Sequence, residues 1–215
     1  HDLPALWREA RELGLATPNV GLLTNIIACP GGDFCALANA KSIPVAQAIQ
    51  ERFDDLDYLH DIGELDLNIS GCINSCGHHH VGHIGVLGVD KQGAEYYQVT
   101  IGGNQGEVPG VRAPAAIGKV IGPAFAQHEV AWVVQRLIET YLERRESEDE
   151  RFVDCVHRIG IEPHRRLHGC HAQQLQQVIL EHVAHDAGLL VIAAAVFHSH
   201  RLGRGDLHMI DITTI

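Results

Sequence analysis

Four of the six cysteines lie in two close pairs, and these pairs are the feature of the sequence best suited to chemistry. Cys29 and Cys35 are separated by five residues that include Pro30 and two glycines, whereas Cys72 and Cys76 are separated by three. No secretory signal pattern opens the sequence, and the chain is long enough to bury a core. Thiolates that bind a metal or a cofactor are therefore favoured over disulfide bridges.

Four thiolates can hold either zinc or an iron-sulfur cluster. Structural zinc sites usually take cysteines two to four residues apart, so the second pair fits a zinc site while the first is too wide. A four-iron cluster is larger and suits thiolates that are spaced more widely and flanked by glycines. The spacing favours an iron-sulfur cluster and leaves zinc and unliganded cysteines as alternatives.

The two motifs resemble the cluster-binding motifs of the sirohaem-dependent sulfite and nitrite reductases. They are Ala28–Cys35 (ACPGGDFC) and Ser70–Gly77 (SGCINSCG), and the resemblance runs from about Leu3 to Ile161, including the glycine-rich loop at Gly102–Asn104. It implies an α+β fold, namely the C-terminal cluster and sirohaem domain of these enzymes, with a mixed sheet flanked by helices.

The resemblance also implies roles for individual residues. Cys76 is expected to ligate the cluster and to bridge it to the sirohaem iron, which makes it the catalytic residue. Asn74 and Asn104 are expected to bind the cofactor, although Asn74 also suits a plain turn. The expected ligands of the 4Fe-4S cluster are Cys29, Cys35, Cys72 and Cys76.

The implied activity is the six-electron reduction of sulfite to sulfide, or of nitrite to ammonia. The resemblance implies an electron donor, either a flavoprotein or a ferredoxin. Two other functions stay open from the residues: an iron-sulfur electron carrier without haem, and a zinc-stabilised binding module. Sirohaem absorption, a cluster shoulder alone, or no colour would distinguish the three.

A run of histidines follows the second motif. The related reductases commonly have an acidic residue seven positions after the last cysteine, where this chain has His83. Imidazoles are common metal ligands, so a separate metal site is one interpretation. A role beside the sirohaem and a purely structural role are the others. The run comprises His78, His79, His80 and His83.

Charge and hydropathy exclude other classes. The net charge of −11 argues against a nucleic-acid surface, and the longest apolar run, residues 187–197, is shorter than the roughly 20 residues of a membrane span. We therefore expect a cytoplasmic protein. Sirohaem and the substrates are anionic, yet residues 18–110 contain eleven acidic residues against Lys41, Arg52 and Lys91. The positive charge is expected from a missing N-terminal half of the same enzyme, which makes this chain a fragment.

The elements that position the cysteines follow from periodicity and turn residues. Asp2 is a candidate N-cap for the first helix, while Trp7, Trp132 and Cys155 are expected in the core.

The chain is divided into four parts. Residues 1–17 are interpreted as the end of a preceding ferredoxin-like domain, 18–126 as the cluster and sirohaem domain, 127–163 as C-terminal helices, and 164–215 as an unassigned histidine-rich tail, which contains Cys170. The expected elements are a helix over 2–13, an extended segment over 19–27, two helices within 35–53, a strand over 65–69, a hairpin of 84–89 and 96–101, and helices over 128–145, 152–158 and 173–183.

Overall fold

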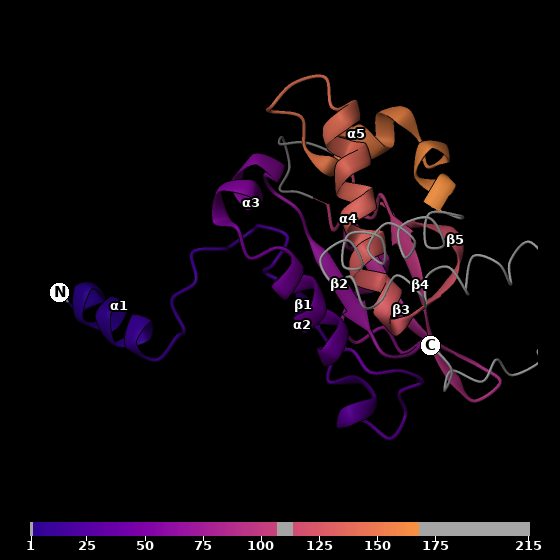
Figure 1. The fold of residues 1–215 in the computed structure, drawn as a ribbon, viewed down its shortest axis with the longest axis horizontal. Coiled ribbons are helices and arrows are strands. Elements are labelled where there is room, and N and C mark those ends of the chain that lie inside the picture. Colours follow the sequence, from indigo (N-terminus) through magenta and orange to yellow (C-terminus); the bar gives the residue numbers. More distant parts are fainter. Residues whose placement is uncertain (1, 107–113, 168–215) are drawn as a thin grey trace, which may run out of the picture. The chain divides into compact units, whose positions relative to one another are not determined.

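A mixed five-stranded sheet forms the centre of the fold, in the order β1-β2-β3-β4-β5 (Figure 1). The computed structural model describes residues 2–106 and 114–167. Strands β1, β2 and β3 are parallel, whereas β3, β4 and β5 are antiparallel. The strands are β1 (Ile27–Ala28), β2 (Leu67–Ser70), β3 (Ile84–Lys91), β4 (Ala94–Ile101) and β5 (Lys119–Ala126).

Within the described residues, five α-helices and three short 3₁₀ helices accompany the sheet. Helices α2 and α4 pack against each other, and α4 also contacts β4 and β5. Among the described residues, no helix is long and apolar enough to cross a membrane. The helices are α1 (Leu3–Glu12), η1 (Gly31–Asp33), α2 (Ile43–Arg52), α3 (Leu56–Ile62), η2 (His79–Val81), α4 (Gln127–Arg144), α5 (Phe152–Ile159) and η3 (Glu162–Leu167).

The two faces of the sheet differ in polarity because side chains alternate along each strand. On β2, Leu67 and Ile69 point into the hydrophobic core beneath α2 and α4. Asn68 and Ser70 point to the opposite face, although both are buried. Gly85 of β3 pairs with Asn68, so it lies on the same polar face. The residues that follow the cysteines cover this face, as described below.

Several expected elements are confirmed. The hairpin is formed by β3 and β4, and the strand expected over 65–69 corresponds to β2. The long amphipathic helix is α4, and the helix expected over 152–158 is α5, closed by Gly160. Cys155 is fully buried in α5, and Trp132 packs against the core. The α+β class with a mixed sheet is confirmed as well.

Other expectations are wrong. Trp7 is 49% exposed on α1, and the Asp2 side chain does not cap that helix. Residues 19–26 form turns rather than an extended segment, because local hydrogen bonds such as that from the Asn25 N–H to the Leu22 carbonyl close them. One helix, not two, lies within 35–53. The helix expected over 173–183 lies outside the described residues.

One α-helix and one long strand were not anticipated from the sequence. Helix α3 begins after Asp55, whose carboxylate accepts hydrogen bonds from the Asp57 and Tyr58 N–H groups. Strand β5 includes Gly122 and Pro123, residues that are rare in central strands. As an edge strand, β5 tolerates a residue without an N–H group, which explains why its composition resembles a loop.

Candidate metal-cluster site

The parallel pairing of β1 with β2 brings the two cysteine motifs together. Ala28 is opposite Ile69 in this pair, so Cys29 and Gly71 leave the same edge of the sheet side by side. The Cys29 N–H continues the ladder to the Ile69 carbonyl at 3.1 Å. The Gly71 N–H in turn donates to the Cys29 Sγ atom at 3.1 Å. The first motif therefore contacts the backbone next to Cys72 directly.

Glycines allow the two loops to approach so closely. The Gly71 carbonyl accepts hydrogen bonds from the N–H groups of Asn39 at 2.8 Å and Ala40 at 3.0 Å. A Cβ atom at Gly71 would lie 2.6 Å from the Ala40 oxygen and 2.9 Å from the Gly31 Cα atom. Gly31 itself has a φ of +63°, which side chains disfavour. These bonds also explain why residues 35–42 do not form a helix.

All four motif cysteines are free thiols with different exposure. Cys72 is buried, Cys29 and Cys35 are partly buried, and Cys76 is exposed. The Cys29 Sγ atom also lies 3.4 Å from the Ser42 hydroxyl. Hydrogen bonds to sulfur tune the reduction potential of iron-sulfur clusters, so this thiol already has contacts of the required kind.

Four free thiols beside glycine-rich loops are donors that either a 4Fe-4S cluster or a zinc ion can use. Zinc would hold its sulfur ligands at about 2.3 Å, which requires the thiols to converge tightly. Within residues 2–106 and 114–167, no three His, Cys, Asp or Glu side chains are placed to hold one metal ion. The same finding applies to the separate histidine site considered from the sequence.

Apolar side chains border the thiols. Phe34, Leu37 and Ile73 are 79%, 72% and 80% exposed, which is unusual for residues of this size. The basic residues of this region have partners: Lys41 lies 3.4 Å from an Asp33 oxygen, Arg52 donates to the Gln135 side chain, and Lys91 lies over the Tyr96 ring. Residues close to the cysteines in sequence thus expose large apolar side chains, and the three basic residues of 18–110 are engaged with other side chains.

The segment from Cys76 to His83 lies on the polar face of the sheet. The Ser70 hydroxyl accepts a hydrogen bond from the Gly77 N–H at 3.1 Å. The Asn68 amide donates to the His78 carbonyl, also at 3.1 Å. A Cβ atom at Gly77 would overlap the Ile69 carbonyl oxygen, so the backbone needs a glycine there. Two β2 side chains thus fix the chain immediately after Cys76.

Two residues flanking Cys76 adopt left-handed backbone conformations. Ser75 has a φ of 59° and His78 a φ of 55°, and each costs on the order of 1–2 kcal/mol for a residue with a side chain. The Ser75 hydroxyl lies 3.1 Å from the Nδ1 atom of His79, which is buried. Such conformations persist only where surrounding contacts enforce them.

The histidines differ in their surroundings. His78 and His80 are exposed. Burial lowers the pKa of His79 to about 4, and the neighbouring His80 ring, whose centroid lies 3.9 Å away, acts in the same direction. His79 is therefore neutral at pH 7. His80 holds its segment through its carbonyl, which accepts from the Gly118 N–H at 2.8 Å.

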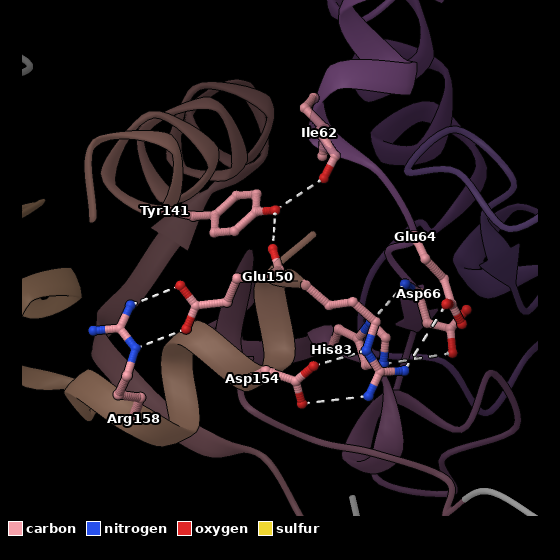
Figure 2. Close-up of polar contacts among 9 residues, drawn as sticks. Ile62, Glu64, Asp66, His83, Tyr141, Glu150, Asp154 and Arg158 are labelled. Carbon is pink, nitrogen blue, oxygen red and sulfur yellow. Dashed lines mark hydrogen bonds and ion pairs between the residues drawn. The ribbon is translucent and has the colours of Figure 1, made fainter. Parts of the chain in front are cut away.

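His83 belongs to a polar cluster that includes Glu64, Asp66 and Asp154 (Figure 2). The Nδ1 atom of His83 accepts a hydrogen bond from the Asp66 N–H at 3.1 Å. The neutral ring therefore carries its proton on Nε2. This Nε2 atom lies 4.0 Å from an Asp66 carboxylate oxygen. Burial lowers the pKa of His83; Asp66 opposes the shift, while Arg151 reinforces it. Arg151 is ion-paired with Asp154 and Glu64. The contact between Asp66 and His83 thus joins the residues that immediately precede β2 and β3.

The two asparagines singled out from the sequence lie in turns. Asn74 is exposed in the turn between Cys72 and Cys76. Asn104 is buried and pairs with Ala116 through both backbone groups at 2.9 Å, while its Oδ1 atom accepts from the Gly106 N–H at 3.1 Å. Their cofactor contacts stay a prediction. Sequence reasoning missed Asn68 and Ser70. They could have been noticed as polar residues within a strand that is otherwise apolar.

Comparison with known families agrees with this geometry. The nitrite and sulphite reductase 4Fe-4S domain matches residues 21–174, which include both cysteine motifs. The chain belongs to this family. The domains of this family bind a 4Fe-4S cluster, which is consistent with the donor set described above.

Individual relatives support the assignment. Sulfite reductase (ferredoxin) of Mycobacterium tuberculosis is 30% identical over 153 residues, covering 67% of this chain and 26% of that protein. The assimilatory-type sulfite reductase of Nitratidesulfovibrio vulgaris is 26% identical over 163 residues, covering 75% of this chain and 67% of that protein. The chain thus spans about a quarter of the length of the mycobacterial reductase.

Two solved structures have a similar fold. The Mycobacterium tuberculosis NirA protein superposes with a TM-score of 0.61 at 26% identity, covering 76% of this chain and 30% of that one. Dissimilatory sulfite reductase I superposes with a TM-score of 0.52 at 14% identity, covering 64% and 51% of the two chains. The second likeness concerns the fold alone.

Proposed function

We propose that this chain is the cluster- and sirohaem-ligating part of an assimilatory sulfite or nitrite reductase. The observation that carries the proposal is the hydrogen bond from the Gly71 N–H to the Cys29 Sγ atom, which joins the two cysteine motifs at one edge of the sheet. Family membership supports the 4Fe-4S cluster. The reductases among the relatives support the reaction class.

Each motif cysteine has a proposed role. Cys76 is the most exposed of the four, which suits a thiolate shared between the cluster and a second cofactor. Sirohaem, when bound, supplies the iron at which sulfite or nitrite is reduced by six electrons delivered singly. The proposed cluster ligands are Cys29, Cys35, Cys72 and Cys76.

The chain's own residues contribute enclosure rather than positive charge. Phe34, Leu37 and Ile73 offer an apolar border that can exclude water once covered. We propose that the cations facing the sirohaem carboxylates and the substrate come from the part of the longer relatives that this chain does not span. A flavoprotein or a ferredoxin is the proposed electron donor.

The test is anaerobic reconstitution with iron, sulfide and sirohaem, followed by visible absorption and electron paramagnetic resonance. The wild-type chain is expected to take up a 4Fe-4S cluster. Cys76→Ser is expected to lose the cluster and its coupling to sirohaem together, because one thiolate serves both. Cys155→Ser is the matched control, since Cys155 is buried in α5 outside both motifs.

Full cofactor content in Cys76→Ser would refute the bridging role. A cluster without any sirohaem binding, even when the remainder of the longer reductases is supplied, would favour the electron carrier, and a colourless protein containing zinc would favour the binding module. Reduction of sulfite or nitrite with reduced methyl viologen as the electron donor is expected only when the remainder of the longer reductases is supplied. Substantial turnover by this chain alone would contradict the proposed origin of the positive charge.

A further inference from the structure

The two polar residues of β2 occupy positions where apolar residues would be expected. Asn68 and Ser70 are essentially inaccessible to solvent in a strand whose other residues are Leu67 and Ile69. Burying a polar side chain is unfavourable unless a hydrogen bond compensates for it. The Ser70 hydroxyl accepts a hydrogen bond from the Gly77 N–H, and the Asn68 amide donates one to the His78 carbonyl. Both bonds thus go to the backbone directly after Cys76.

The backbone that they hold is strained on both sides of the cysteine. Ser75 and His78 are left-handed, so the segment would relax to another conformation if its contacts were removed. The Ser70 and Asn68 bonds act at Gly77 and His78, between Cys76 and the remainder of the loop. The Cys76 side chain itself is exposed.

We propose that Asn68 and Ser70 are positioning residues that hold the backbone after Cys76 in its strained conformation and thereby set the placement of the Cys76 thiolate toward the cluster. This inference rests on the proposed function, since it assumes that Cys76 is a ligand. On this inference, the position of one of the four thiolates depends on side chains of the sheet and not on the loop alone. Outer contacts of this kind commonly affect metal retention strongly.

Four single variants of the full chain test the proposal. Ser70→Ala removes the acceptor for the Gly77 N–H, and Ser70→Thr restores a hydroxyl. Asn68→Leu removes the donor to the His78 carbonyl at similar volume, and among the described residues the Asn68 Oδ1 atom has no partner to lose. Thr100→Val is the matched control, because Thr100 is a buried hydroxyl on the same face that bonds to Gly85 instead.

Two readouts are needed. In the protein without cofactors, amide hydrogen exchange over residues 76–83 is expected to accelerate roughly tenfold in Ser70→Ala and Asn68→Leu, as for the loss of one buried hydrogen bond. After reconstitution, a chelator is expected to remove iron from these two variants about tenfold faster or more, with altered electron paramagnetic resonance. Ser70→Thr and Thr100→Val are expected to behave as the wild type.

The outcomes separate the inference from the proposed function. Faster exchange with an unchanged cluster signal and unchanged iron loss would overturn the positioning role, because the two side chains would then only stabilise the loop. If Thr100→Val showed the same hydrogen exchange and the same iron loss as Ser70→Ala and Asn68→Leu, the positioning role would be overturned as well. A wild-type chain that takes up no cluster would overturn the proposed function and this inference together.

Discussion

Replacing Gly71 by alanine is expected to separate the two cysteine loops. The new Cβ atom would lie 2.6 Å from the Ala40 carbonyl oxygen, which must move by about 0.8 Å to restore an ordinary contact of 3.4 Å. Both nearest neighbours, the Ala40 oxygen and the Gly31 Cα atom, are backbone atoms. They cannot rotate away as a flexible side chain would.

The magnitude follows from the contacts that would be disturbed. Overpacking of this kind costs about 1–3 kcal/mol. The two hydrogen bonds that the Gly71 carbonyl accepts from Asn39 and Ala40 are worth about 1 kcal/mol each, and they would lengthen. The free energy of unfolding is therefore expected to fall by about 2–4 kcal/mol. The bond from the Gly71 N–H to Cys29 Sγ would be disturbed at the same time.

The assay combines urea denaturation of the cofactor-free chain with the iron content after reconstitution. Gly32→Ala is the matched control, because its Cβ atom would meet neighbours at 3.4–3.5 Å and its φ is not positive. That variant is expected to change stability by less than about 0.5 kcal/mol and to retain the cluster. If Gly71→Ala and Gly32→Ala proved equal in both measurements, close packing would not be what joins the two motifs.

Three further comparisons are expected to show measurable differences in urea denaturation. Arg151→Met should lower the free energy of unfolding by about 2 kcal/mol, because the buried Arg151 side chain is ion-paired with Asp154 and Glu64. Arg158→Met should lower it by less, because Arg158 is exposed, and equal effects would contradict this contrast. Tyr141→Phe should cost about 1–2 kcal/mol, because the hydroxyl lies 2.7 Å and 3.1 Å from two backbone carbonyl oxygens; an unchanged midpoint would argue against these bonds (Figure 2). Burial lowers the pKa of His164 to about 4, so the unfolded chain takes up a proton between about pH 6.5 and 4 that the folded chain does not, and stability falls as the pH drops through this range. His164→Phe should make that fall shallower by up to about 1.4 kcal/mol per pH unit, and an identical slope in both proteins would refute the assignment.

The elements that sequence periodicity located are those whose signals are local. The hairpin of β3 and β4 has turn residues between two apolar runs, and α4 has a continuous apolar stripe. Strand β5 escaped notice because Pro123 and Gly122 are tolerated only by its place at the sheet edge. Residues 35–42 looked helical, but the Asn39 and Ala40 N–H groups bind the distant Gly71 carbonyl instead.

For the site, the sequence by itself determined the chemistry, namely four thiols in two glycine-flanked motifs and a shortage of cations beside them. The sequence could not show that the two motifs lie side by side. The hydrogen bond from Gly71 to Cys29 depends on the parallel pairing of β1 and β2, which lie far apart in the chain. Nor could the sequence assign Asn68 and Ser70. Alternation predicts that they share a face of the sheet, but only the packing of the Cys76–His83 segment on that face buries them and gives them partners.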